Sequence, residues 1–264
     1  MIKLVATDID GTLLQSGERE VPEAVFVQID RLLKKGILFA AASGRQYSNL
    51  KNLFAPKAEE MTFLCENGAI LYRKDQILKK RPMPRSRAEA LAKQILANDD
   101  MEVLISGANT SYLMPKHDDY IYHIQYFLGN RVEIVHSLDE IKEDMIKVSA
   151  YCRSGAAKYD KPFGDPWRGE FSAAVAGEKW LDFMLSDKGT GMRDLCGVLG
   201  ISLEDVIAIG DNYNDLSMIK DAGLGVGVQN AAPGIKPDCD YITMATCEEG
   251  AVCEVIEKFV LKGE

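Results

Sequence analysis

The sequence of 264 residues contains no apolar run that approaches the length of a membrane span. The longest apolar stretches, such as Ile37 to Ala42, are far shorter than the roughly 20 residues that a transmembrane helix requires. The first residues, MIKLVATDIDGTLL, interrupt a short apolar segment with acids, unlike the basic, apolar and small-residue regions of a signal peptide. We therefore expect a cytoplasmic protein.

Cysteine is present, but it forms no CxxC pair and no dense framework. The six cysteines are Cys65, Cys152, Cys196, Cys239, Cys247 and Cys253. Most of them lie among apolar residues, which predicts reduced core thiols rather than disulfides or a zinc site. The histidines His117, His123 and His136 show no metal-ligand spacing either.

Positive charge is also scarce, because 31 Lys and Arg residues face 40 Asp and Glu residues and give a net charge of −9. This balance argues against a general affinity for nucleic acid or for an anionic membrane. The hydrophobic fraction of 47% with 27% charged residues is typical of a folded protein, which excludes a largely disordered chain.

Strand and helix signals alternate in two separate parts of the chain. In the first part, strands are predicted at Lys3 to Thr7, Ile37 to Ala42 and Thr62 to Cys65, with a helix after Pro22 and another ending near Phe54. In the second part, helices are predicted at Thr190 to Leu199, at Leu216 to Ala222 and from Thr246, where Thr246 and Glu249 form a capping box, with strands at Val206 to Ile209 and Gly225 to Val228. This alternation favours a parallel sheet covered by helices.

The middle of the chain has a different texture. Short strand signals separated by polar segments, a helix opened by a capping box of Ser86 with Glu89, and a helix near Tyr120 to Leu128 predict an α+β domain. We therefore predict one interrupted α/β core domain, residues 1–83 and 185–264, with an α+β cap inserted at residues 84–184. The core is expected to be a doubly wound parallel sheet.

Polar residues follow three of the predicted core strands. They are Asp8 and Asp10 after the first strand, Ser43, Gly44 and Arg45 after the second, and Asp211, Asn214 and Asp215 after Val206 to Ile209. In open parallel sheets, ligands bind outside the carboxyl ends of the strands, so we expect the four aspartates to converge. Two carboxylates about 4 Å apart repel each other by roughly 4 kcal/mol at an effective dielectric constant near 20. Such a cluster needs a proton or a cation, and oxygen-only ligands favour Mg²⁺.

Four motifs in order carry a family resemblance. They are DIDGT at Asp8 to Thr12, Ser43 after an apolar strand, Lys188 at the start of a helix, and GDNYND at Gly210 to Asp215. Together they resemble the haloacid dehalogenase (HAD) superfamily, specifically its Cof-type branch of sugar-phosphate phosphatases with a C2-type (IIB) cap. ENGA at Glu66 to Ala69 and AGLGVGVQNA at Ala222 to Ala231 also look like this branch, and the resemblance spans the whole chain. It implies a Rossmann-like core.

The resemblance implies specific roles for the acidic residues. Asp8 would be the nucleophile that forms an aspartyl phosphate, and Asp10 would protonate the leaving alcohol and then activate water. Mg²⁺ would be held by Asp8, by the backbone carbonyl of Asp10 and by Asp211. Asn214 and Asp215 would shape the metal surroundings and orient Lys188.

The remaining site residues are implied to bind the phosphate group. Ser43 would donate a hydrogen bond to a phosphate oxygen, the backbone of Gly44 would add a donor, and Lys188 would supply a positive charge. Arg45 has two interpretations, a phosphate contact or a structural ion pair, and the sequence favours neither.

These observations predict a Mg²⁺-dependent phosphatase that hydrolyses small phosphate monoesters, sugar phosphates or related phosphorylated metabolites, with no nucleic-acid or membrane partner. A phosphotransferase or phosphomutase could use the same aspartyl phosphate with a second substrate hydroxyl in place of water. A non-catalytic phospho-receiver is the third hypothesis, and it would have no need of Asp10 as an acid.

Overall fold

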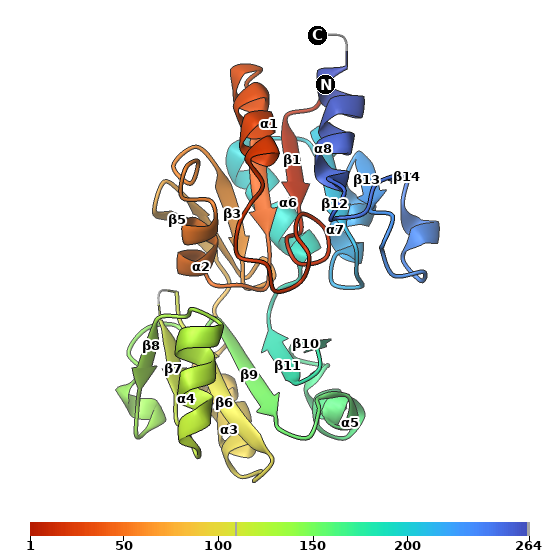
Figure 1. Cartoon of the computed structure of the whole chain (residues 1–264). Coiled ribbons are helices and arrows are strands. Elements are labelled where there is room, and N and C mark those ends of the chain that lie inside the picture. Colours follow the sequence, from red (N-terminus) through yellow and green to blue (C-terminus); the bar gives the residue numbers. More distant parts are fainter. Residues whose placement is uncertain (109, 263–264) are drawn as a thin grey trace. The chain divides into compact units, whose positions relative to one another are not determined.

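The computed structural model describes residues 1–108 and 110–262, and the chain divides into two compact units (Figure 1). Unit 1 consists of Met1–Lys79 and Asp187–Glu264, and unit 2 consists of Lys80–Ser186. Each unit has its own sheet and its own hydrophobic core. None of the helices formed by the described residues is long and apolar enough to cross a membrane.

Unit 1 is built on a sheet with the strand order β14-β13-β12-β1-β2-β3-β4-β5. The strands are β1 (Leu4–Thr7), β2 (Leu38–Ala42), β3 (Thr62–Cys65), β4 (Ile70–Arg73), β5 (Gln76–Lys80), β12 (Val206–Gly210), β13 (Leu224–Gly227) and β14 (Tyr241–Ile242). The neighbours from β14 to β3 are parallel, and β4 returns antiparallel to β3. The prediction of a doubly wound parallel sheet is confirmed.

Helices cover both faces of this sheet, which explains why its central strands are continuous apolar segments. The helices of unit 1 are α1 (Glu23–Lys34), α2 (Tyr47–Leu53), α6 (Lys188–Leu199), α7 (Leu216–Asp221) and α8 (Ala251–Ile256), with a π-helical turn at Glu257–Leu261. Leu4 and Ala6 of β1 pack with Met192 of α6 and Met218 of α7. Helix α1 packs with α8 and with β2 (Figure 1). Every residue of β1 and β12 is buried.

Two helix starts in unit 1 differ from the predicted ones. Helix α6 begins at Lys188, as the family resemblance implies, and two residues before the start at Thr190 that the residue pattern predicts, because the Asp187 carboxylate accepts a hydrogen bond of 2.6 Å from the backbone N–H of Thr190. The predicted contact of Thr246 with Glu249 exists, but it closes a turn. Gly250 follows with φ of 87°, a left-handed conformation that ends the turn, and α8 begins only at residue 251.

Unit 2 is an α+β unit, as the sequence predicts. Its sheet has the order β10-β11-β9-β6-β7-β8, and all pairs are antiparallel except β7 with β8. The strands are β6 (Met101–Ser106), β7 (Ser111–Leu113), β8 (Val132–Ile134), β9 (Lys147–Cys152), β10 (Ser172–Ala176) and β11 (Trp180–Met184). Its helices are α3 (Arg85–Leu96), α4 (Asp118–Tyr122) and α5 (Ala157–Tyr159), and 3-10 turns lie at Leu138–Glu140 and Asp165–Trp167.

The helices of unit 2 correct two expectations. The capping box of Ser86 with Glu89 is wrong, because Pro84 precedes a helix that already begins at Arg85, and Ser86 lies inside the first turn. Glu89 instead accepts a hydrogen bond of 2.8 Å from Nε of Arg85. The single helix expected near Tyr120 to Leu128 is the short helix α4 followed by a π-helical turn at His123–Phe127.

All six cysteines are unbridged. Cys65, Cys152 and Cys196 are buried, as expected of core thiols, and the other three are half-buried. Burial raises the pKa of the Cys65 thiol well above its ordinary range, which keeps this thiol protonated.

Candidate active site

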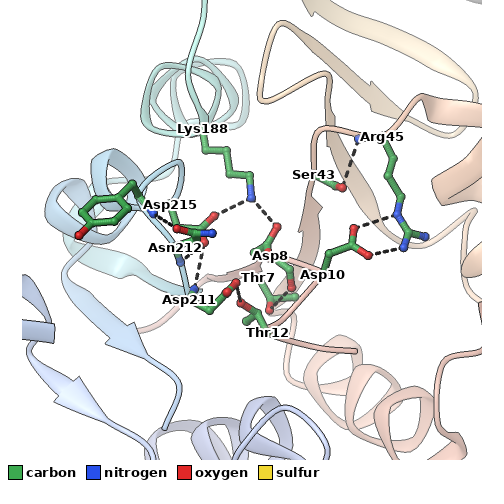
Figure 2. A network of polar contacts seen from close by, with 11 residues as sticks. Thr7, Asp8, Asp10, Thr12, Ser43, Arg45, Lys188, Asp211, Asn212 and Asp215 are labelled. Atoms are coloured by element: carbon green, nitrogen blue, oxygen red, sulfur yellow. Dashed lines mark hydrogen bonds and ion pairs between the residues drawn. The ribbon is translucent and has the colours of Figure 1, made fainter. Parts of the chain in front are cut away.

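Asp8 and Asp211 lie side by side at the carboxyl edge of the unit 1 sheet. Asp8 directly follows β1, and Asp211 directly follows β12, the parallel neighbour in which Ile209 is paired with Thr7. The backbone N–H of Asp8 continues this ladder with a hydrogen bond of 2.9 Å to the carbonyl of Ile209. The carboxyl ends of the two central strands therefore bring residues 203 positions apart in the sequence to one place (Figure 2).

Lys188 connects this edge to helix α6. Its side chain is fully buried, and Nζ donates hydrogen bonds to Oδ1 of Asp8 and, at 2.5 Å, to Oδ1 of Asp215 (Figure 2). Burial opposes the positive charge, but attraction to Asp215 and Asp8 outweighs it and raises the pKa of the ammonium group. Lys188 is therefore charged when the protein is folded, and its charge faces Asp8.

One ammonium group does not balance the carboxylates around it. Burial is the largest cause that raises the pKa of Asp8 well above its ordinary value of 3.8, and repulsion from Asp215 and Asp211 adds to it while Lys188 opposes it. The pKa of Asp211 is raised as well, again by burial first and then by Asp215. The cluster thus holds an excess of negative charge that a cation would relieve.

Carboxylate oxygens of Asp8, Asp211 and Asp215 all lie within 4.8 Å of one another. This group could hold a metal ion, and its all-oxygen donors suit Mg²⁺ or another hard divalent cation. The loop that follows Asp10 packs closely against the Asp211 carboxylate. A Cβ at Gly11, which has φ of +95°, would lie 2.6 Å from Oδ2 of Asp211, and Oγ1 of Thr12 donates a hydrogen bond of 2.8 Å to Oδ1 of the same residue.

Asp215 fixes the loop that carries Asp211. Its Oδ1 binds Lys188, and its Oδ2 accepts hydrogen bonds of 3.0 Å from the backbone N–H groups of Asp211 and Asn212 (Figure 2). A Cβ at Gly210 would lie 2.4 Å from Cβ of Asp215, so glycine is required there. Asn214, in contrast, is exposed.

Asp10 points away from this acidic group and toward Arg45 (Figure 2). Nε of Arg45 lies 2.9 Å from Oδ2 of Asp10, and Nη2 binds Oδ1, so the guanidinium group contacts both carboxylate oxygens. Of the two interpretations that the sequence leaves open for Arg45, the structure contains the ion pair. Ser43 is buried at the end of β2, where its Oγ accepts a hydrogen bond of 3.2 Å from the backbone N–H of Arg45.

The turn Glu66–Gly68 is a part of the site to which sequence reasoning assigned no role. All three residues have positive φ, at 50°, 51° and 83°, although only one of them is glycine. The backbone N–H of Asn67 donates to the carbonyl of Ser43, and a Cβ at Gly68 would lie 2.7 Å from the carbonyl of Asp187. The turn therefore packs between the Ser43 loop and the start of α6. The dipeptide Asn67-Gly68 is the sequence signal for such a turn.

Curated relatives match the whole chain. A 5-amino-6-(5-phospho-D-ribitylamino)uracil phosphatase of Escherichia coli is 27% identical over 266 residues, covering 100% of this chain and 97% of the relative. A phosphoglycolate phosphatase of Saccharolobus solfataricus is 28% identical over 265 residues, covering 100% and 98%.

Solved structures share the fold over both units. A haloacid dehalogenase-like hydrolase of Bacteroides thetaiotaomicron superposes with a TM-score of 0.83 at 26% identity, covering 97% of this chain and 99% of that one. A HAD subclass IIB sugar phosphatase superposes with a TM-score of 0.81 at 21% identity, covering 97% and 98%, and shows the same fold. The family description that matches residues 5–256 is haloacid dehalogenase-like hydrolase. The chain belongs to this family, as its motifs predict.

Proposed function

We propose that this hydrolase is a Mg²⁺-dependent phosphatase that acts on small phosphate monoesters through an aspartyl phosphate on Asp8. The observation that carries the proposal is the position of the Asp8 carboxylate, which lies at the sheet edge between the Lys188 ammonium group and the carboxylate of Asp211. An anion can serve as a nucleophile toward a phosphate ester only where positive charge offsets the repulsion between them. The residues around Asp8 are suited to hold that charge.

In the first step, an Asp8 oxygen forms a bond to phosphorus while the bond from phosphorus to the alcohol oxygen breaks, and Asp10 gives its proton to that oxygen. In the second step, water attacks the phosphorus of the aspartyl phosphate, Asp10 accepts a proton from the water, and the carboxylate of Asp8 is released. Arg45 contacts both oxygens of Asp10 and so holds this carboxyl group in one orientation, while each oxygen keeps a further lone pair that can carry the proton.

Mg²⁺ fits the donor set of this site, because the metal-ligating groups that the described residues bring together here are all carboxylates. Asp8, Asp211 and the backbone carbonyl of Asp10 would hold it, and the ion would neutralise charge on the phosphate group. Asp215 is better suited to a supporting role, because its two oxygens already bind Lys188 and the backbone of residues 211 and 212. Asn214 would support the same region from the exposed side.

Phosphate binding would use Ser43, Gly44 and Lys188. Lys188 is the strongest of these assignments, because its buried ammonium group contacts the proposed nucleophile. Ser43 is buried and directly follows the neighbouring strand β2, and its hydroxyl group and the backbone N–H of Gly44 would donate hydrogen bonds to a phosphate oxygen.

The names of the relatives indicate the substrate class. Two whole-chain relatives are named as phosphatases of phosphorylated small molecules, and we extend that class to this chain. We also propose that unit 1 is the catalytic core, that unit 2 is the cap that selects the substrate, and that the protein acts in the cytoplasm without nucleic-acid or membrane partners.

Phosphate release from a panel of phosphorylated metabolites tests this proposal, with and without Mg²⁺, for the wild type and for Asp8→Asn and Asp10→Asn. We expect turnover of at least one monoester only with the metal, and loss of that turnover in both variants. Undiminished turnover by Asp8→Asn would contradict the covalent mechanism. Phosphate transfer to an added sugar phosphate without hydrolysis would indicate a phosphotransferase or mutase, and stable phosphorylation of Asp8 without either reaction would indicate a receiver.

A further inference from the structure

Three consecutive residues in the turn between β3 and β4 have positive φ. They are Glu66 at 50°, Asn67 at 51° and Gly68 at 83°. This left-handed conformation is unfavourable for residues other than glycine, although asparagine tolerates it better than most. Backbone strain of this kind persists only where the surrounding structure enforces it, and it concentrates at functional sites. The contacts of the turn Glu66–Gly68 show which part of the site it serves.

Backbone hydrogen bonds tie one side of this turn to the loop after β2. The N–H of Asn67 donates to the carbonyl of Ser43 at 2.9 Å, and the N–H of Glu66 donates to the carbonyl of Arg45 at 3.2 Å. The two bonds hold the residues before and after Gly44. Because Ser43 and Gly44 are the proposed phosphate donors of this loop, a displacement of the turn would displace these donors as well.

The other side of the turn packs against the start of helix α6. A Cβ at Gly68 would lie 2.7 Å from the carbonyl oxygen of Asp187, and a Cβ at Gly191 would lie 2.5 Å from Cα of Gly68. The two backbones are therefore in direct contact, with no room for a side chain between them. Lys188 lies between Asp187 and Gly191 in the sequence. The turn thus fixes the helix start that carries Lys188 relative to the loop at Ser43.

The side chain of Asn67 lies against the place that a side chain on Gly44 would take. A Cβ at Gly44 would lie 3.3 Å from Nδ2 of Asn67 and 3.5 Å from its Oδ1. Glycine has more backbone freedom than any other residue, so a glycine N–H is a well-aimed donor only where neighbouring atoms restrict that freedom. The amide group of Asn67 supplies such a restriction at Gly44.

Asn67 carries two features that destabilise the free protein. Its Oδ1 is buried and accepts no hydrogen bond from the residues that the structure describes, and its φ is left-handed. A buried polar atom without a partner and a strained backbone both cost free energy, and glycine at this position would remove both costs. An asparagine here therefore fits a role in function better than a role in stability.

We propose that Asn67 is a positioning residue of the phosphate site, whose amide group holds the Gly44 peptide so that its N–H donates to a phosphate oxygen. The turn Glu66–Gly68 at the same time keeps this donor and the Lys188 ammonium group at a fixed separation, so that both reach one phosphate group. Asn67 acts through Gly44 and takes part in no bond-making or proton transfer. This inference rests on the proposed phosphatase function.

Binding of inorganic phosphate in excess Mg²⁺, measured by calorimetry, tests this role together with the Tm of each variant. Asn67→Gly keeps the left-handed backbone and the N–H that donates to Ser43, but it removes the amide group. We expect its Kd for phosphate to rise about tenfold, the value of roughly one hydrogen bond to a charged group, while its Tm changes little. Asn67→Asp keeps the shape but places a negative charge beside Gly44, so it should weaken phosphate binding further.

Lys74→Gly is the matched control, because Lys74 has a φ of 49° and lies in the turn between β4 and β5, where it is exposed. Its Kd for phosphate should equal that of the wild type. Unchanged phosphate binding by both Asn67 variants overturns the inference, even where the wild type hydrolyses a phosphate ester and the phosphatase proposal stands. Weaker binding that appears only with a large fall in Tm in both variants also overturns it, because Asn67 would then serve stability. A wild type that neither binds phosphate nor hydrolyses any ester overturns the phosphatase proposal itself, and the inference falls with it.

Discussion

Nζ of Lys188 lies 2.5 Å from Oδ1 of Asp215, and both side chains are fully buried. The carboxylate that holds the lysine also accepts two backbone hydrogen bonds from the loop that carries Asp211. Asp215 therefore positions both Lys188, the cation beside Asp8, and Asp211, the acid on the other side of Asp8. The proposed chemistry at Asp8 depends on this arrangement as much as on Asp8 itself.

Asp215→Ala should destabilise the protein by about 3–5 kcal/mol, because it removes one partner of a buried ion pair and leaves two backbone donors unpaired. Urea denaturation measures this change. The exposed pair of Lys220 with Asp238, 3.0 Å apart, is the control, and Asp238→Ala should cost no more than about 1 kcal/mol. Equal costs for the two variants would contradict the structural role assigned to Asp215.

A second prediction concerns the contact of Gly11 with Asp211. Gly11→Ala combines a left-handed φ of +95° with a Cβ placed 2.6 Å from Oδ2 of Asp211. Gly17 has nearly the same φ, +94°, but a Cβ there would meet nothing within 4 Å. Gly17→Ala should therefore cost only the backbone strain, about 1–2 kcal/mol.

Gly11→Ala should lower the free energy of unfolding by more than Gly17→Ala does, because Asp211 must move to admit the new Cβ. The same movement should raise the Mg²⁺ concentration needed for half-maximal activity. Thermal denaturation and a Mg²⁺ titration of phosphate release measure the two effects. If Gly11→Ala and Gly17→Ala have the same Mg²⁺ requirement, the loop at Gly11 does not shape the metal site.

The central strands could be predicted from the sequence, because strands buried on both faces are continuous apolar segments whose polar residues begin where the strand ends. The same rule identified Asp8, Ser43 and Asp211 as neighbours at one edge. Lys188 was identified by resemblance alone, since a lysine at a helix start is unremarkable until the carboxylates near it are known.

Contacts that depend on tertiary geometry could not be predicted. The sequence offers Arg45 either a phosphate contact or an ion pair, and only the backbone path of the loops after β1 and β2 decides that it contacts Asp10. Polar or aromatic residues (Lys147, Ser149 and Tyr151) alternate with apolar ones along strand β9, and the sequence shows this alternation. It does not show which face of the strand is covered by helix α3. Helix starts were missed where Gly250 or Pro84 overrides a capping pattern.

The pH dependence of metal binding provides a third prediction. The pKa values of Asp8 and Asp211 lie above 3.8 in the metal-free protein, so the folded state binds protons more tightly than the unfolded chain does. The contribution of these groups to stability is therefore greatest at low pH and is lost as the pH rises from about 3.8 through the raised pKa values. Mg²⁺ binds the ionised carboxylates and competes with these protons.

The increase in Tm caused by Mg²⁺ should consequently grow with pH over this range, and thermal denaturation at a series of pH values measures it.

Asp8→Asn removes one of the repelling charges, so without metal this inactive variant should be more stable than the wild type by about 0.5–2 kcal/mol. Its Tm should also rise less on addition of Mg²⁺. An increase in Tm that does not vary with pH would count against carboxylate ligation.

The last prediction separates the two roles open to Arg45. If Arg45 acts by orienting Asp10, Arg45→Lys keeps a positive charge but loses the two-point contact, and proton delivery to the leaving alcohol becomes slower. An alkyl phosphate needs that proton, whereas p-nitrophenolate leaves readily without it. We expect kcat to fall about tenfold or more for an alkyl ester and distinctly less for p-nitrophenyl phosphate. Equal losses for the two esters, accompanied by a higher KM, would instead assign Arg45 to phosphate binding.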